Sequence, residues 1–203
     1  MTFSSCLTEE TSGLVLDASV IINLLATGHA SSILQALPVV PIVTDNVLGE
    51  IRNGAINGRP ELAKLTELID HQILRVAELN APALESFFSI VSGPASQSLG
   101  DGEAATLAYA HHGSLIAAID ERKATRVAQE RFGQLRLATT VDIFAFDQVS
   151  QRLGPELLPA VVLDALRLAR MQVWDYQFDW VVQQIGASNV QTCPSLRRLA
   201  RAR

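Results

Sequence analysis

The feature that most constrains the fold is a regular alternation of short apolar runs with longer amphipathic stretches between residues 13 and 140. Strand length and apolar character single out five runs, LVLD (14–17), PVVPIVT (38–44), ILRVAEL (73–79), SLIAAID (114–120) and LRLATT (135–140). The stretches between them carry apolar residues at helical spacing. Strands that alternate with helices indicate βαβ units. We therefore predict an α/β fold with a mostly parallel sheet that is covered by helices on both faces.

The last third of the chain has a different character. From Val141 onward no segment reads as a strand, whereas residues 156–173 and 175–185 carry apolar residues at helical spacing. The basic ending SLRRLARAR predicts a frayed terminus. We predict an α/β domain over residues 13–140 and a C-terminal helical extension with a basic tail over residues 141–203.

Composition limits the possible partners and locations. The 203 residues are 48% hydrophobic and 18% charged, which predicts a well-filled core. The net charge of −5 gives no overall attraction to nucleic acid, so a polyanion would need a local basic patch or metal ions. Cys6 and Cys193 lie near opposite ends and do not suggest a disulfide framework. With no signal-peptide pattern and no long apolar run, we expect a cytoplasmic protein without a membrane segment.

Acidic residues occur where a parallel sheet would gather them. Asp17 and Asp120 each end a predicted strand, and Glu103 begins a helix after a glycine-containing loop. Such positions meet at one rim of a parallel sheet, and Glu50, on the helix after the second strand, can lean over that rim. Carboxylates at short range raise one another's pKa unless a cation lies between them. Oxygen ligands without His or Cys suit Mg²⁺ or Mn²⁺, which promote attack on a phosphodiester.

Each acid also has a simpler structural explanation. Asp17 could cap the helix that begins near Ser19, and Glu50 could be a solvated helix residue. Asp101 is better explained as an N-cap than as a ligand, and the helix dipole favours Glu103 in a first turn. Asp120 is the hardest to explain this way, because an acid after SLIAAI is unfavourable unless it is paired or used.

Four segments, in order along the chain, resemble the PIN-domain nucleases. They are LVLDASVIINLL, VLGEI, LGDGEAATLAYA and LIAAIDERKATRVA, and the last two are similar to the prokaryotic, VapC-like subgroup of PIN proteins that contains a Gly-Glu pair. The resemblance covers residues 13–140. It implies a parallel sheet of about five strands and Mg²⁺- or Mn²⁺-dependent endoribonuclease activity on single-stranded RNA. Many relatives of this kind are toxins, which implies a small antitoxin protein as a possible partner.

The resemblance also implies roles for particular residues. By position Asp17, Glu50, Glu103 and Asp120 match the four acidic residues of the family, and Asp17, Glu103 and Asp120 are the expected metal ligands. Asp101 is a rival for the third acidic role.

Further positions match the family less specifically. Glu121 could add another acid beside Asp120. Ser19 matches a hydroxyl residue that orients a ligand or phosphate, and Asn23 matches a position that is often polar. Ser19 and Asn23 are equally consistent with an ordinary helix start and helix surface.

Several basic residues have two possible explanations. Arg122 and Arg126 share a helix face and could hold RNA phosphates, or they could form a solvated face with Glu130. The tail arginines at positions 197, 198, 201 and 203 could serve RNA or an acidic partner, although a solvated end is the simpler explanation.

Asp142 and the C-terminal extension each allow more than one role. Asp142 either reaches the acidic rim or starts a helix, and the second role is favoured. The extension could cover a sheet edge, form the homodimer that we expect, or bind a partner. For the whole chain, a PIN-like binding module without catalysis is the alternative function.

Repulsion within the acidic set makes one prediction about stability. Asp120→Asn should raise the melting temperature of the metal-free protein, unless Asp120 has a structural partner.

Overall fold

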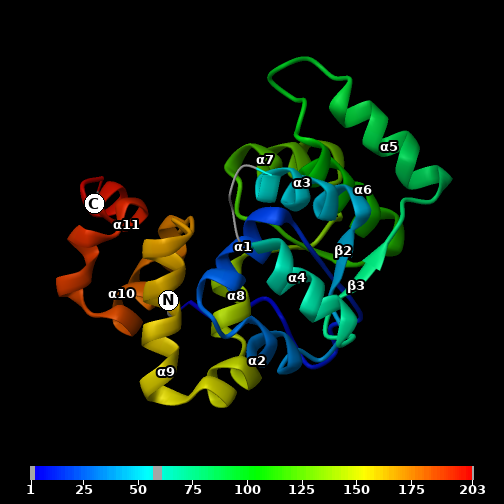
Figure 1. Cartoon of the computed structure of the whole chain (residues 1–203). Helices are drawn as coiled ribbons and strands as arrows, with labels where there is room; N and C mark the ends of the chain where they lie inside the picture. Colours follow the sequence, from blue (N-terminus) through cyan, green and yellow to red (C-terminus); the bar gives the residue numbers. More distant parts are fainter. Residues whose placement is uncertain (1–2, 57–60, 203) are drawn as a thin grey trace.

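A five-stranded parallel sheet forms the centre of the protein, and its strand order is β3-β2-β1-β4-β5. The computed structural model describes residues 3–56 and 61–202 (Figure 1). The strands are β1 (Leu14–Leu16), β2 (Ile42–Thr44), β3 (Arg75–Ala77), β4 (Ile116–Ala118) and β5 (Leu137–Ala138). Each lies inside a predicted run but is shorter than that run. The predicted parallel sheet is confirmed.

Helices cover both faces of the sheet. They are α1 (Ala18–Ala26), α2 (Ala30–Gln35), α3 (Asp45–Ile56), α4 (Glu61–Asp70), α5 (Ala81–Val91), α6 (Asp101–Gly113) and α7 (Arg122–Arg131). Side chains along β1 alternate between two separate apolar clusters, with Leu14 and Leu16 in one and Val15 in the other. Because successive side chains of a strand point to opposite faces, this alternation shows that both faces are buried.

The C-terminal region is helical throughout its regular structure. It contains α8 (Thr140–Ala145), α9 (Asp147–Leu168), η1 (Asp175–Gln177), α10 (Phe178–Ile185), η2 (Ala187–Thr192) and α11 (Pro194–Ala200). A kink interrupts α9 at Gly154, whose φ of 74° and ψ of 171° are not helical and which precedes Pro155. One apolar cluster runs from Leu7 through the sheet to Leu199. The extension therefore shares a core with the sheet.

Most of the basic ending forms helix α11 (Pro194–Ala200), so the prediction of a frayed terminus was wrong for these residues. Leu196 is fully buried and Leu199 is 9% exposed, and both belong to the main apolar cluster. The arginines of α11 are exposed on its other side. The prediction followed the basic composition of this segment, but the segment is amphipathic and its apolar residues pack into the core. Arg203 lies outside the described residues.

No helix within residues 3–56 and 61–202 combines the length and apolar character needed to cross a membrane.

Packing of α11 predicts a measurable contribution to stability. Leu196→Ala should lower the free energy of unfolding by about 2–5 kcal/mol, because it removes a fully buried side chain and leaves a cavity. Urea unfolding followed by circular dichroism measures the change. The matched control is Leu168→Ala, whose side chain is 68% exposed and should change stability by at most about 0.5 kcal/mol. Equal effects of the two substitutions would show that α11 does not pack as described.

Candidate functional site

The candidate site lies where β1 and β4, two neighbouring central strands, reach their carboxyl ends. The Asp17 backbone N–H donates to the Ala118 carbonyl at 3.0 Å, so Asp17 continues the pairing of β1 with β4. Asp120 follows β4 by two residues. Both carboxylates are only 2% exposed. The parallel register thus brings together the two acids that the sequence placed at strand ends.

Asp17 combines a structural role with an unsatisfied oxygen. Its Oδ2 accepts hydrogen bonds from the Ser19 backbone N–H at 3.1 Å and the Ser19 hydroxyl at 2.6 Å, which caps α1. Its Oδ1 is buried and has no hydrogen-bond partner among the described residues. Burial raises the pKa of Asp17, and the Glu121 charge adds to this effect. The capping explanation therefore accounts for one oxygen of Asp17 and leaves the other unexplained.

Asp120 is held from two sides. Its Oδ1 accepts from the Thr140 backbone N–H at 2.9 Å, while its Oδ2 accepts from the Thr140 hydroxyl at 2.5 Å and the Asn23 amide at 2.6 Å. The pKa of Asp120 is nevertheless raised to about 6, because burial and, to a smaller extent, the Asp17 charge outweigh the lowering effect of these hydrogen bonds. Asn23 is itself buried and also donates to the Thr140 hydroxyl.

Thr140 is a site residue that the sequence reasoning missed. It follows β5, the strand beside β4, and so occupies the same rim as Asp17 and Asp120. The strand-end rule that found the two acids could have found this residue as well.

Glu103 lies close enough to the other acidic residues for their charges to raise its pKa. In the first turn of α6, its carboxylate accepts from the Gly100 backbone N–H at 3.2 Å. The pKa of Glu103 is raised to about 7, mainly by burial and also by the charges of Asp17, Glu121 and Glu50. Like charges at close range and partial burial both disfavour ionisation. Asp101, the rival for this position, begins α6 with an exposed side chain.

Glu50 approaches the site across the start of α6. Its carboxylate lies against Gly102, where a Cβ atom would collide with it. Gly102 therefore allows α3 to present Glu50 at the N-terminus of α6, which is the positive end of the helix dipole. Glu50, Asp101 and Glu103 line a hollow of about 680 Å³ on this side.

Glu121 and Asp142 act as helix caps. The Glu121 carboxylate accepts from the Ala124 N–H at 2.7 Å and so caps α7. Asp142 forms a capping box with Thr139 at the start of α8, as the sequence favoured.

The starts of α1, α6 and α7 thus converge on the acidic residues. The partial positive charge of these helix N-termini offsets part of the carboxylate repulsion.

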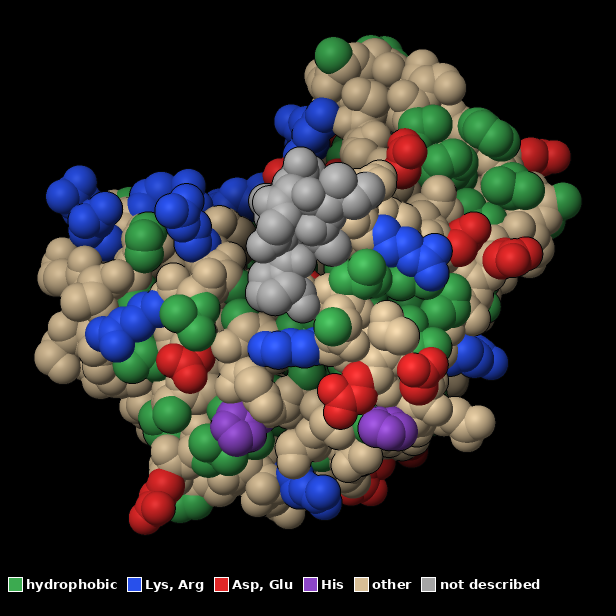
Figure 2. Space-filling view, viewed as in Figure 1, with side chains coloured by type: hydrophobic (Ala, Val, Ile, Leu, Met, Phe, Trp, Pro, Cys, Tyr) green, Lys and Arg blue, Asp and Glu red, His purple; other side chains and the backbone are tan. Residues whose placement is uncertain are grey.

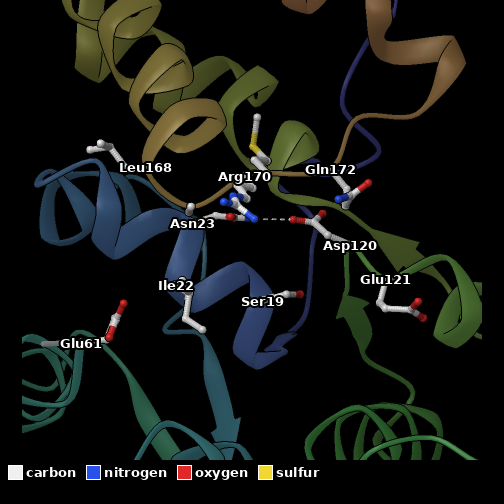
Figure 3. A pocket seen from close by; sticks show the side chains of 11 residues that line it. Ser19, Ile22, Asn23, Glu61, Asp120, Glu121, Leu168, Arg170 and Gln172 are labelled. Carbon is white, nitrogen blue, oxygen red and sulfur yellow. Dashed lines mark hydrogen bonds between the residues drawn. The ribbon is translucent and has the colours of Figure 1, made fainter. Parts of the chain in front are cut away.

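An open cleft of about 550 Å³ adjoins Asp120 (Figure 3). Helix α1 contributes Ser19, Ile22 and Asn23 to its wall, and β4 leads to Asp120 and Glu121. The opposite wall comes from residues 168–172, which follow α9. No sequence pattern assigns this segment to the site, because its position depends on how α9 folds back over α1.

Arg122 and Arg126 of α7, the predicted basic pair, both contact other residues of the protein. The Arg126 guanidinium donates to the Ser96 carbonyl at 2.9 Å and lies 3.9 Å from the Glu130 carboxylate. The Arg122 guanidinium stacks over the Trp174 ring at 4.8 Å from its centroid. The contacts of Arg126 match a solvated face, whereas Arg122 connects α7 to the extension.

The donor set fits a hard divalent cation. Oxygen ligands without His or Cys are what Mg²⁺ and Mn²⁺ prefer, and Asp17 Oδ1 is a buried acceptor that no described residue satisfies. In the part of the chain that is described, no three His, Cys, Asp or Glu side chains are already grouped as a metal site. The residues therefore fit such an ion without being preassembled around it.

Comparison with known proteins agrees with the fold. A family model described as a PIN domain matches residues 13–166, about three quarters of the chain. No curated protein matches the chain.

The hydrogen bonds of Asp120 change the stability test that repulsion alone suggested. An amide at position 120 would turn an N–H₂ group toward donors on Thr140 or Asn23. Lost hydrogen bonds would then oppose the relief of repulsion. A substitution at Glu103 tests repulsion more directly, because a glutamine at this position could still accept the hydrogen bond from the Gly100 N–H.

We predict that the metal-free protein loses stability as the pH rises. A carboxyl group whose pKa is higher in the folded state than in the unfolded state binds more protons when the protein is folded. Its contribution to the free energy of unfolding is therefore complete below the unfolded-state pKa and is lost as the pH rises through the folded-state pKa. For Glu103 this window runs from 4.5 to about 7, and for Asp120 from 3.8 to about 6. Urea unfolding in EDTA between pH 4 and pH 8 measures the trend.

Glu103→Gln should flatten this pH dependence. At pH 8 we expect it to raise the free energy of unfolding by about 1 kcal/mol, a value reduced for solvent screening. Glu85→Gln, at an exposed position on α5, is the matched control. A stability that rises with pH in this range, or an unchanged slope in Glu103→Gln, would contradict repulsion within the site.

Proposed function

Because the chain belongs to the PIN-domain family, whose members are usually nucleases, we propose that it is a metal-dependent endoribonuclease that cleaves single-stranded RNA. One observation carries the proposal. Asp17 holds a buried carboxylate oxygen that accepts no hydrogen bond from any described residue, beside acids whose charges raise one another's pKa. An unsatisfied buried acceptor is unfavourable for folding alone, and a cation would satisfy it.

In this proposal Asp17, Glu103 and Asp120 hold Mg²⁺ or Mn²⁺, and Glu50 contributes the fourth acid. When bound, the ion supplies an activated water and neutralises charge on the phosphodiester. The protein's own contribution is to fix the ligands. Ser19 orients the Asp17 carboxylate, and Thr140 with Asn23 orients Asp120. Such supporting hydrogen bonds are worth about 10–100-fold in metal affinity or activity.

The biological setting that we propose is the toxin of a toxin–antitoxin pair, acting in the cytoplasm with a small antitoxin protein as its partner. A homodimer is part of the same proposal. Leu84 and Phe88 on α5 are 38% and 57% exposed, and Figure 2 shows apolar side chains gathered near this helix. Exposed apolar side chains on one helix are suited to a protein contact.

Cleavage of a labelled single-stranded RNA with Mn²⁺ tests the nuclease proposal. Asp17→Asn and Asp120→Asn should each lower the rate by at least about 100-fold, because a ligand matters at least as much as the residues that support it. Calorimetry should show weakened Mn²⁺ binding in the same variants. Asp70→Asn, at an exposed position that ends α4, is the control and should retain full activity. If the unsubstituted protein and both variants bind RNA but are equally inert, the chain is a binding module and the nuclease proposal fails.

A substitution at Gly102 tests Glu50 without removing its charge. In Gly102→Ala the new methyl group would force the Glu50 carboxylate to turn away. We expect cleavage to fall about 10-fold, while the melting temperature stays the same or rises, because alanine favours helix more than glycine. Gly49→Ala is the matched control, since a Cβ there meets no described atom within 4 Å. Full activity of Gly102→Ala would mean that the position of Glu50 does not matter for cleavage.

A further inference from the structure

We propose that the connection leaving α9, residues 168–174, is a phosphate-binding track for the RNA strand, with Arg170 as the side chain that holds a phosphate next to the cut. This inference rests on the proposed function, because it assumes that RNA enters the cleft beside Asp120. The family match ends at residue 166. The helical spacing over residues 156–173 predicted helix as far as Val173, but α9 ends at Leu168 and residues 169–173 leave the helix.

The segment lies in the same cleft as the acids. Arg170 and Gln172 line the hollow of about 550 Å³ together with Ser19, Asn23 and Asp120. Figure 3 shows the Arg170 side chain reaching into this hollow from the end of α9, on the side of Asn23. A guanidinium here is therefore next to the place where a phosphodiester would meet the acids.

The backbone at Arg170 has an unusual conformation for a non-glycine residue. Its φ is +59°, and it directly follows Ala169, the C-cap of α9. The next N–H, from Met171, donates to the Ala165 carbonyl at 3.0 Å. Glycine is the usual residue at this left-handed position after a helix. A side chain is less favourable there. Gln72 and Ser114 adopt the same left-handed conformation after α4 and α6, so this geometry turns the chain at Arg170 toward the cleft but does not by itself indicate a use for the guanidinium.

The Arg170 guanidinium is also available. Its side chain is exposed and forms no hydrogen bond or ion pair with residues 3–56 or 61–202, although Asp120, Glu121 and Glu61 line the same hollow. By contrast, Arg126 and Arg167 are engaged, the second with Asn189 and Thr192. A free guanidinium can bind a phosphate through two parallel N–H···O bonds.

Two further arginines hold the segment at its sides. Arg122 donates to the Val173 carbonyl at 3.4 Å while it stacks on Trp174, and Arg198 of α11 donates to the Gln172 side chain at 3.2 Å. The segment is thus bordered by cations from α7 and α11. Figure 2 shows basic side chains gathered over the C-terminal helices at the upper left. Positive charge next to an acidic cleft suits a strand whose cut phosphate lies at the acids and whose neighbouring phosphates need cations.

Binding of RNA in EDTA tests the track separately from cleavage. The probe is a fluorescent single-stranded RNA of mixed sequence, about 12 nucleotides long to cover the cleft and its flanks, titrated with the full chain at several salt concentrations. Arg170→Ala should raise the Kd about 10-fold and reduce the slope of log K against log salt by about 0.7, the value for one lost phosphate contact on a single strand. Arg170→Lys keeps the charge but not the two parallel N–H···O bonds, so it should keep the salt slope of the unsubstituted chain while its Kd lies between those of the unsubstituted chain and Arg170→Ala.

Arg152→Ala is the matched control, because Arg152 is an exposed arginine of α9, before the kink at Gly154, and does not line the cleft. It should leave both the Kd and the salt slope unchanged. With Mn²⁺ present, Arg170→Ala should raise KM about 10-fold and change kcat by less than about 3-fold, as expected for a binding contact.

The outcomes separate this inference from the proposed function. Absence of RNA binding by the unsubstituted chain, or an unchanged Kd and salt slope in Arg170→Ala, would overturn the track. A loss of kcat with an unchanged Kd would also overturn it, since Arg170 would then act on the acids. If a polyglutamate peptide binds more tightly than RNA and only its binding depends on Arg170, the segment serves an acidic protein partner and the track is wrong. If RNA binds as expected but is not cut with Mn²⁺, the proposed function fails while the track stands.

Discussion

Two carboxylates buried at the ends of neighbouring parallel strands set the conditions for the rest of the structure. Asp17 and Asp120 are both 2% exposed, and the pairing of β1 with β4 leaves them little freedom to separate. Burial and mutual repulsion both disfavour their charged forms. Much of the surrounding structure reduces this cost. Helices α1, α6 and α7 turn their N-termini toward the rim, while Ser19, Asn23 and Thr140 donate hydrogen bonds to the two carboxylates.

These contacts offset only part of the cost of burying the two carboxylates. Within the described residues Asp17 Oδ1 still lacks a donor, and the pKa values of Glu103 and Asp120 remain raised to about 7 and about 6. A site selected for stability alone would replace such acids with apolar or neutral residues of similar size. The divalent cation that we propose at the rim would account for the presence of these acids in the core. The same acids that reduce stability without metal would then hold the ion.

The C-terminal extension has two consequences for this site. Leu196 and Leu199 of α11 join the main apolar cluster, which makes the extension part of the core instead of a loose tail. Packing of α9 against the sheet domain also brings residues 168–172 to the cleft, where they form the wall opposite α1. The extension supplies arginines to a region that is otherwise acidic. An overall net charge of −5 is therefore compatible with a polyanionic substrate, because recognition depends on local charge.

The sequence by itself determined the parallel α/β architecture and the strand-end acids, because apolar periodicity and topology are enough to place Asp17 and Asp120 on one rim. It also favoured Glu103 over Asp101 as the third acid, which stays a prediction; in the structure the Glu103 side chain is partly buried and the Asp101 side chain is exposed. Tertiary structure decided what depends on contacts between distant segments. Gly102 matters only because α3 passes over α6, and Arg170 reaches the cleft only because α9 folds back over α1. No local pattern encodes these approaches, since each is set by the packing of whole elements on a shared core.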